Sequence, residues 1–359
     1  MNALHLHDPE LLTRELCDIP SVSGAEAQLA DAVEVAVSGL PHLRVLRDGD
    51  TVVASTDLGR PRRVVIAGHL DTVPVHGNLP VIQEVRDGER WLVGRGTVDM
   101  KGGVAAQLSA AAALRDPTWD ITWVWYDQEE VDAALNGLGR VMDRHPDWIG
   151  GDFAILGEPT SARIEGGCNG SCRFWISVPG LRAHSARAWM GHNAIHDAAD
   201  VIERARSFPE TTVRVDGLDY REGLNAVQIE GGVAGNVIPD LCRIHFNYRF
   251  APDKSARQAE TLMRERFAGF ELQMVDMSPG ARPGLDAPET RAFVQAIGED
   301  VLPKYGWTDV ARFSALGIPA VNYGPGDARL AHADNEAVRV SEILDCAAGL
   351  RRWLGPDGH

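Results

Sequence analysis

Seven histidine and carboxylate residues have types and positions suited to binding metal ions. Each follows a short apolar run or lies in a glycine-rich loop; they are His69, Asp71, Asp99, Glu129, Glu130, Glu158 and His332. Acidic groups that converge beyond buried strands would repel one another and would be costly to remove from water. Two divalent cations resolve that conflict, because one carboxylate can bridge both ions while histidine and further carboxylates complete each coordination shell. The pattern therefore indicates a site for two metal ions.

Each of these residues also has a simpler structural interpretation. Asp99 could cap the helix that follows it, and Glu158 could be a turn residue. Glu129 and Glu130 could be a solvated pair, and His332 could precede a capped helix. Taken singly, these structural roles are favoured. The metal interpretation depends on all of the residues falling at strand ends or loops of one sheet.

The elements that would position these residues have the pattern of an α/β sheet. Residues 62–74, 120–130 and 151–160 each read as an apolar strand that ends in polar residues. An alanine-rich helix is expected between the first two strands, over 100–116. Strands that alternate with helices, each delivering polar residues at its carboxyl end, are typical of a sheet with its site along that edge.

The pattern changes near residue 173 to that of an α+β segment, and after about residue 285 the first pattern resumes. Candidate antiparallel strands cover 173–180, 224–232 and 240–250, and candidate amphipathic helices cover 191–208 and 255–269. We therefore expect a discontinuous catalytic domain over 1–174 and 286–359, with a smaller domain inserted over 175–285.

Composition narrows the class of protein. The formal net charge of −16 argues against a nucleic-acid partner, because phosphate binding needs a basic face. No apolar stretch approaches the roughly 18 to 20 residues that span a bilayer, and the N-terminus lacks the pattern of a signal peptide. The five cysteines are scattered without a CxxC pair, which favours a reducing compartment. We expect a cytoplasmic protein with neither nucleic-acid nor membrane partners.

Several motifs together resemble the M20 metallopeptidase and aminoacylase family. They occur in order along essentially the whole chain: GHLDTVP (68–74), GRGTVDMKGG (94–103), the Glu129-Glu130 pair, GEPT (157–160), GLRAHSARAWMGHNA (180–194), GNVIP (235–239) and LAHADNE (330–336). The resemblance implies a zinc-peptidase-like α/β domain, whose mixed sheet is flanked by helices. It also implies an inserted α+β domain of ferredoxin-like type that serves as lid and joins a homodimer.

The resemblance also implies which residues bind the metals. Asp99 would bridge two divalent ions. Zinc is the expected metal, and cobalt and manganese are the alternatives. His69 and Glu158 would complete one metal site, and Glu130 and His332 would complete the other.

Further roles follow from the same resemblance. Glu129 would be the general base, and Asp71 would accept a hydrogen bond from the far nitrogen of His69. His184 of the partner subunit would stabilise the oxyanion. Two more residues of the inserted domain would hold a substrate carboxylate: Asn236 and Arg249.

The expected reaction is amide hydrolysis of a small acidic N-acyl amino acid, by water activated on the metals with Glu129 as base. NAVQIEGGVAGNVIP and NYRFAPD are most similar to actinobacterial members that hydrolyse N-succinyl-LL-2,6-diaminopimelate to succinate and LL-diaminopimelate, a step of lysine and diaminopimelate biosynthesis. The alternatives are deacetylation of N-acetylornithine, another aminoacylase activity or a carboxypeptidase. A succinyl group needs an extra cation for its distal carboxylate, and three arginines are candidates: Arg173, Arg182 and Arg187.

Two other classes of protein fit the sequence less well. A serine hydrolase is disfavoured because the chain has no GxSxG nucleophile elbow. A non-catalytic binding protein on the same scaffold should have lost a ligand or the base. The set is complete here, including Glu129, so catalysis is favoured.

Overall fold

The computed structural model describes residues 4–298 and 300–356 and divides into two units. Unit 1 holds the chain up to Gly166, Gly284–Leu302 and the chain from Arg312 onward, and unit 2 holds Gly167–Pro283 and Pro303–Ala311. Unit 2 starts before the expected residue 175, because strand β9 (Gly170–Pro179) already belongs to it. Each unit is built around its own sheet, and the predicted fold class is confirmed.

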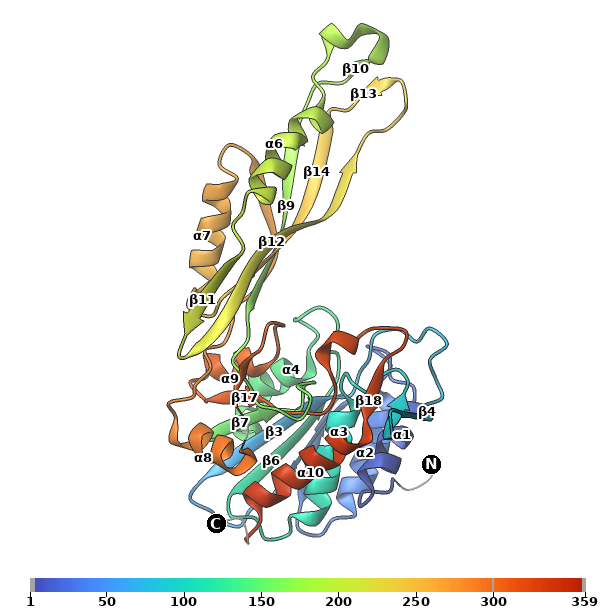
Figure 1. Cartoon of the computed structure of the whole chain (residues 1–359), viewed down its shortest axis with the longest axis vertical. Helices are drawn as coiled ribbons and strands as arrows, with labels where there is room; N and C mark the ends of the chain where they lie inside the picture. Colours follow the sequence, from blue (N-terminus) through green and yellow to red (C-terminus); the bar gives the residue numbers. More distant parts are fainter. Residues whose placement is uncertain (1–3, 299, 357–359) are drawn as a thin grey trace. The chain divides into compact units, whose positions relative to one another are not determined.

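An eight-stranded mixed sheet forms the centre of unit 1, in the order β1-β2-β6-β3-β7-β17-β8-β16 (Figure 1). Its strands are β1 (Arg44–Asp48), β2 (Thr51–Ser55), β3 (Arg63–His69), β6 (Asp120–Tyr126), β7 (Phe153–Leu156), β8 (Glu165–Gly166), β16 (Leu302–Pro303) and β17 (Ala320–Asn322). β3 is parallel to β6 and β7, and β7 is parallel to β17. The carboxyl ends of these four strands therefore meet at one edge of the sheet.

Helices bury one face of this sheet. They include α1 (Pro9–Asp18), α2 (Ala27–Ser38), α3 (Lys101–Ala113) and α10 (Val340–Leu354), and both α1 and α10 contact α3. α3 is buried from Lys101 to Ala112, because its glycine and alanine side chains are small enough to let it pack closely on its neighbours. At the end of α10, Trp353 packs on Trp119 and Phe153, with ring centroids 5.2 and 5.8 Å away.

A three-stranded sheet ties the last loop of unit 1 to its middle. It has the order β18-β5-β4, from β18 (Ala337–Arg339), β5 (Glu89–Val93) and β4 (Ile82–Arg86). Because β18 pairs with β5, the segment before β18, which carries His332, is held beside the segment after β5, which carries Asp99. Other elements are α4 (Gly137–Arg144), α5 (Pro146–Ile149), α8 (Pro288–Ile297), α9 (Val310–Ala315) and the short 3-10 turn Ala328–Leu330. In the described ranges, no helix is long and apolar enough to cross a membrane.

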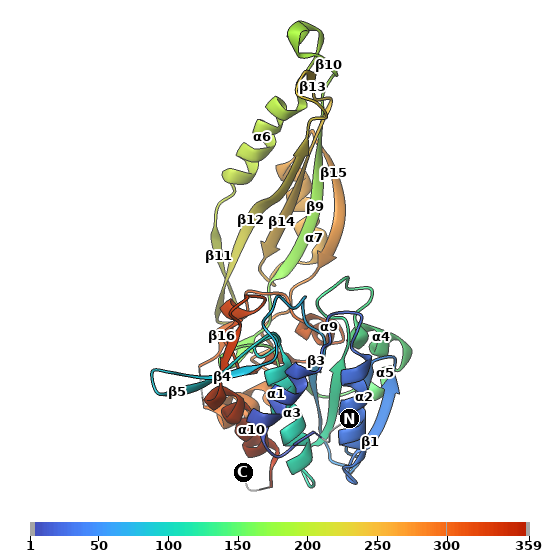
Figure 2. The same ribbon diagram turned by 90° about the vertical axis from the view of Figure 1, so that its right-hand side faces the viewer.

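Unit 2 is a five-stranded antiparallel sheet in the order β11-β12-β14-β9-β15, with α6 (Ala194–Arg206) and α7 (Ala256–Arg266) packed on one face (Figure 2). Its other strands are β11 (Thr211–Val215), β12 (Leu218–Gly231), β14 (Leu241–Phe250) and β15 (Glu271–Ser278). Phe174, Phe246 and Phe267 form the centre of its core.

Two short pairings complete unit 2. β10 (Ala183–His184) pairs with β13 (Val237–Ile238), and a 3-10 helix over Ser185–Met190 follows β10. Near the borders of the unit, Cys168 and Ala281 exchange main-chain hydrogen bonds of 3.0 and 3.1 Å. The chain therefore enters and leaves unit 2 side by side.

Candidate metal centre

The carboxyl edge of the sheet in unit 1 brings the predicted metal ligands together. His69 is the last residue of β3, Glu158 lies just beyond β7, and Asp99 stands just before α3. Donor atoms lie within 4.8 Å of one another in three groups: His69, Asp99 and Glu158; Asp99, Glu130 and His332; and His69, Glu129 and Glu130. The first two groups share Asp99.

The two oxygens of Asp99 face different histidines. Asp99 Oδ1 lies 3.1 Å from His69 Nε2, and Oδ2 lies 3.3 Å from His332 Nε2. His332 Nε2 is also 2.8 Å from Glu130 Oε1. Imidazole nitrogens and carboxylate oxygens suit zinc and several other divalent ions, so the donor set fits a pair of such ions with Asp99 between them.

The carboxylates of this cluster stabilise positive charge, because they raise the pKa values of both histidines. Hydrogen bonds to Asp99 and Glu130 raise the pKa of His332 to about 10. Burial works to lower the pKa of His69, but hydrogen bonds to Asp71 and Asp99 outweigh it and raise that pKa well above its ordinary value. Burial alone would raise the pKa of Asp99, yet the two histidines hold it below its usual range. Without metal, the imidazoles therefore act as the cations that balance the carboxylates.

Asp71 connects His69 to the loop that carries Glu129 and Glu130. Its fully buried carboxylate accepts hydrogen bonds from the main-chain N–H groups of Glu129 and Glu130, at 3.0 and 3.1 Å, and from Ser23 Oγ at 2.7 Å. His69 Nδ1 lies 3.0 Å from the main-chain oxygen of Asp71 and 3.4 Å from its carboxylate. The nearest acceptor is thus the carbonyl group rather than the expected carboxylate, and either one leaves Nε2 of His69 to act as a ligand.

A strained residue precedes the glutamate pair, and Glu26 holds it. Gln128 has a φ of 57°, a left-handed conformation that costs a non-glycine residue about 1–3 kcal/mol. Its N–H donates to Glu26 Oε1 at 3.2 Å, and the same oxygen accepts from Gly24 N at 2.9 Å. Sequence reasoning missed Ser23 and Glu26, for which the only available signal was the break in the helical pattern at residues 19–24.

The other three predicted site residues belong to unit 2. His184 is exposed on β10, where its Nδ1 accepts from Ala186 N–H at 3.0 Å, and its cross-strand partner Val237 directly follows Asn236. Arg249 lies near the far end of β14, opposite Ser171. A strand of ten residues spans about 30 Å, so within one chain Asn236 and Arg249 do not meet.

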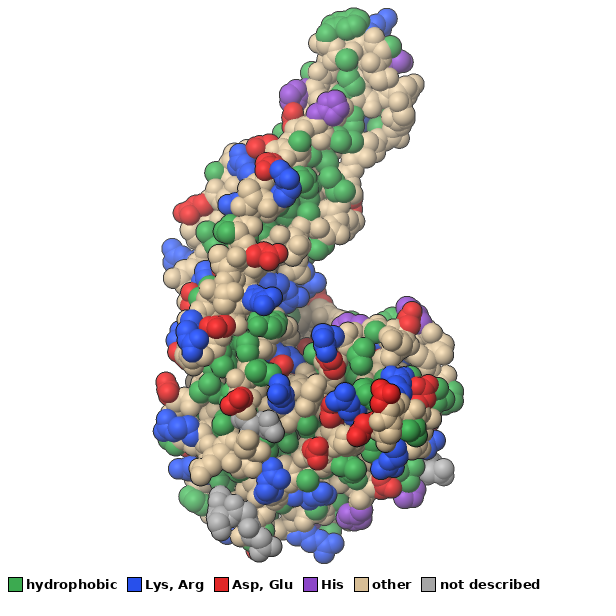
Figure 3. All heavy atoms as spheres, in the orientation of Figure 1, with side chains coloured by type: hydrophobic (Ala, Val, Ile, Leu, Met, Phe, Trp, Pro, Cys, Tyr) green, Lys and Arg blue, Asp and Glu red, His purple; other side chains and the backbone are tan. Residues whose placement is uncertain are grey.

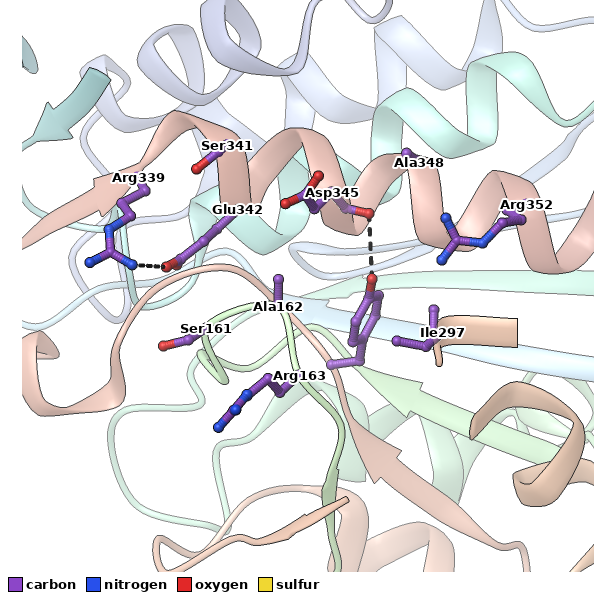
Figure 4. Close-up of a pocket in the computed structure, with 11 residues that line it drawn as sticks. Ser161, Ala162, Arg163, Ile297, Arg339, Ser341, Glu342, Asp345, Ala348 and Arg352 are labelled. Atoms are coloured by element: carbon purple, nitrogen blue, oxygen red, sulfur yellow. Dashed lines mark hydrogen bonds and ion pairs between the residues drawn. The ribbon is translucent and has the colours of Figure 1, made fainter. Parts of the chain in front are cut away.

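A separate cleft of unit 1 contains none of the predicted site residues (Figure 4). It has a volume of about 520 Å³ and lies between α10 and the loop at Ser161 and Arg163. Arg339 at its rim pairs with Glu342 at 3.4 Å. The candidate metal ligands therefore lie outside this cleft.

Two curated proteins of the same kind are similar to this chain over nearly its full length. A putative succinyl-diaminopimelate desuccinylase of Mycobacterium tuberculosis is 51% identical over 351 residues, covering 97% of this chain and 98% of that protein. A succinyl-diaminopimelate desuccinylase of Corynebacterium glutamicum is 46% identical over 360 residues, covering 97% of this chain and 96% of that protein.

Solved structures share the fold at lower identity. An aminopeptidase PepT from Bacillus cereus superposes with a TM-score of 0.76 at 20% identity, covering 97% of both chains. A Bacillus subtilis protein described as a dinuclear metal-binding peptidase of the M20 family gives 0.69 at 17% identity, covering 96% of this chain and 97% of that one. The sequence profile of Peptidase family M20/M25/M40 matches residues 65–355, a span that includes every predicted site residue. The chain belongs to this peptidase family, as its motifs predict.

Proposed function

We propose that this chain hydrolyses N-succinyl-LL-2,6-diaminopimelate to succinate and LL-diaminopimelate. The reaction would use two divalent ions, preferably zinc, bound at the candidate metal centre. The observation that carries the proposal is full-length similarity, at 46% and 51% identity, to two proteins named as desuccinylases for this substrate. The two donor groups that share Asp99 support it, because they could hold two ions side by side. Free thiols at all five cysteines, each buried, support a cytoplasmic location.

Glu129 is the residue suited to move the proton. Bound divalent ions of this kind lower the pKa of a coordinated water from about 15.7 to about 7. The carboxylate of Glu129 belongs to one donor group with His69 and Glu130, while Asp71 fixes its main chain. Glu129 takes the proton of the attacking water and later delivers a proton to the leaving amine.

Arg249 is the best candidate for the succinyl carboxylate. It is half-buried in β14, and within the described ranges its guanidinium group makes no hydrogen bond or ion pair. Burial lowers the pKa of Arg249, and the positive charge of Arg173 lowers it further. The register places Arg173 diagonally across from Arg249 on the same face of the sheet. Two neighbouring guanidinium groups, one unpaired, favour a bidentate carboxylate ligand.

The other two candidate arginines fit less well. Arg182 is exposed and already pairs with Asp240 at 2.9 Å, and Arg187 is exposed in the 3-10 helix. Arg173 itself is 3.3 Å from Asp276. Within the described ranges, Arg249 and Arg187 are the two of these four arginines whose guanidinium groups contact no carboxylate. Of the two, only Arg249 is partly buried.

Substrate preference tests both the reaction and this assignment. Primary-amine release should be fast with N-succinyl-LL-2,6-diaminopimelate and slow with N-acetylornithine. Arg249→Ala should lower kcat/KM for the succinyl substrate by about 10- to 100-fold, the worth of one hydrogen bond to a charged group, and change the acetyl substrate little. Arg182→Ala is the matched control and should leave both rates intact. Hydrolysis of the acetyl substrate alone would overturn the proposed reaction.

The homodimer is proposed from an open edge of the sheet in unit 2. β11 pairs with Leu218–Glu222 of β12, and no described strand covers the outer side of residues 223–231. Val227 and Ile229 on this edge are 56% and 57% exposed, and Ile195 of the adjacent α6 is 42% exposed. Figure 3 shows apolar side chains gathered along this unit. An exposed apolar edge strand is a template for pairing with an identical strand of a second copy.

Mixed dimers would show whether His184 acts across that interface. Glu129→Gln and His184→Ala proteins should each be nearly inactive alone. Co-expressed with different tags, they should recover about a quarter of wild-type activity, because half of the dimers are mixed and each of those holds one intact site. If His184 serves its own subunit, mixing restores nothing. Purified mixed dimers and their mass in solution provide the check.

A further inference from the structure

A buried ion pair, Arg95 with Glu336, lies next to the candidate metal centre but contributes no atom to it. Arg95 is 2% exposed and Glu336 is fully buried, and Nη1 of the arginine lies 2.7 Å from Oε2 of the glutamate. Removing two charges from water costs several kcal/mol per ion, which the attraction within such a pair often fails to recover. The reason for keeping this pair is therefore better sought in geometry than in stability.

The glutamate of the pair holds the main chain at Asp99. Oε1 of Glu336 accepts hydrogen bonds from the N–H groups of Val98 and Asp99, at 2.9 and 3.1 Å. The main-chain oxygen of Glu336 also accepts from Gly94 N at 2.9 Å. These bonds hold the main chain of the loop that carries Asp99, whose carboxylate is shared by two of the donor groups.

The arginine of the pair holds the main chain at His332. Arg95 Nη2 donates to the carbonyl of His332 at 3.3 Å, and Nη1 donates to that of Ala333 at 3.4 Å. Its Nε donates to the carbonyl of Pro74, in the loop that follows His69 and Asp71, at 3.2 Å. His332 has a φ of 64°, so its backbone is in a strained conformation that needs such support.

We infer that the Arg95–Glu336 pair is a positioning device for the metal centre. It joins the loops of Pro74, Asp99 and His332 and thereby sets the spacing between the Asp99 and His332 side chains. Loss of the pair removes no metal ligand, but it lets the loops that carry Asp99 and His332 move apart. The site formed by Asp99, Glu130 and His332 should therefore weaken more than the one formed by His69, Asp99 and Glu158. This inference rests on the proposed metal centre, not on the choice of substrate.

Glu336→Gln tests the inference through metal content. The amide keeps the size of the side chain but removes the charge that binds Arg95. Equilibrated with buffered free zinc, the wild type should hold two ions per chain. The variant should bind one of the two about 10- to 100-fold more weakly, the usual effect of losing a group that orients a ligand. Cobalt absorption spectra of the loaded proteins report the same site independently of turnover.

Asp120→Asn is the matched control. Asp120 is also a buried carboxylate that accepts two main-chain N–H groups, from Leu58 and Arg60 at 2.8 Å each, and an arginine lies 3.7 Å away. It stands at the first residue of β6, whose other end leads to the metal centre. This variant should lose thermal stability yet keep both zinc affinities. Equal zinc loss in both variants would mean general destabilisation and would overturn the inference.

Two further outcomes are decisive. Wild-type zinc affinities in Glu336→Gln would overturn the positioning role while leaving the metal centre standing. A wild type that binds no divalent ion would overturn the metal centre itself. If Glu336→Gln fails to fold, Arg95→Lys serves instead, because lysine keeps the charge but lacks the fork that reaches three carbonyl groups. It should weaken the same ion, and unchanged affinities would again overturn the inference.

Discussion

Replacing Glu129 with glutamine is expected to lower kcat by about 10²- to 10⁴-fold, the range found when a general base is removed. The amide keeps the shape of the side chain and can still hydrogen-bond a water, but it cannot accept a proton. The main-chain N–H of residue 129 would still donate to Asp71, so the loop should keep its conformation. Steady-state kinetics with the succinyl substrate, together with metal content and thermal unfolding, provides the measurement.

The control for this variant is Glu89→Gln, which removes an exposed carboxylate at the start of β5 in the same unit. It should have wild-type kinetics, so that a general effect of net charge is ruled out. Loss of activity in Glu129→Gln with both metals retained assigns the residue to proton transfer. Near-normal turnover would contradict that assignment, and loss of metal would instead make Glu129 a ligand.

Removing the metals is expected to lower the rate of hydrolysis by about a thousandfold or more, since the ions supply several kcal/mol of transition-state stabilisation. Reloading should depend on pH. In the metal-free protein the pKa of His332 is about 10 and that of His69 is well above 6.5, so both imidazoles are protonated at pH 7. Each ion must displace such a proton, so apparent affinity should fall about tenfold per proton for each pH unit of acidification. Zinc content after equilibration at pH 6, 7 and 8 measures this.

The same shifts fix the sign for stability of the metal-free chain. The folded-state pKa of His332 lies above its ordinary value of 6.5 because the protonated imidazole interacts with Asp99 and Glu130. The stabilisation of the folded state by this interaction is therefore complete below about pH 6.5. It is lost as pH rises through about 10, when the imidazole loses its proton beside Asp99 and Glu130. The Tm of the metal-free protein should therefore decline between pH 7 and 10. A Tm that rises over this interval, or zinc affinity without pH dependence, would contradict the assigned protonation.

The sequence predicts the fold and the family correctly because both depend on local signals. The apolar runs that end at His69 and near Glu158 are legible as strands, and parallel strands must bring their carboxyl ends together. The proximity of His69 and Glu158 follows from that rule, whereas Asp99 joins them from the loop before α3. The metal roles and the general base stay predictions until the measurements above are made.

Contacts between distant segments were not predictable in this way. Glu26, Ser23 and Arg95 are ordinary residue types, and each acts on a loop far along the chain. Arg95 lies in the GRGTVDMKGG motif, but the motif does not show which distant groups it contacts. Nothing local indicates that Gln128 adopts a left-handed conformation, since that depends on Glu26 accepting its N–H. Such pairings arise only once the sheet has formed.

The hydrogen bonds between Cys168 and Ala281 have a consequence for how the chain folds. An unfolded insertion of about one hundred residues would impose a loop-closure entropy cost of about 4 kcal/mol on the segments that it separates. Once unit 2 has folded, its entry and exit points are already adjacent, and unit 1 experiences the insertion only as a short connection. Early folding of the inserted unit would thus lower the entropic barrier to assembling the discontinuous sheet, whose strand β17 comes from beyond the insertion.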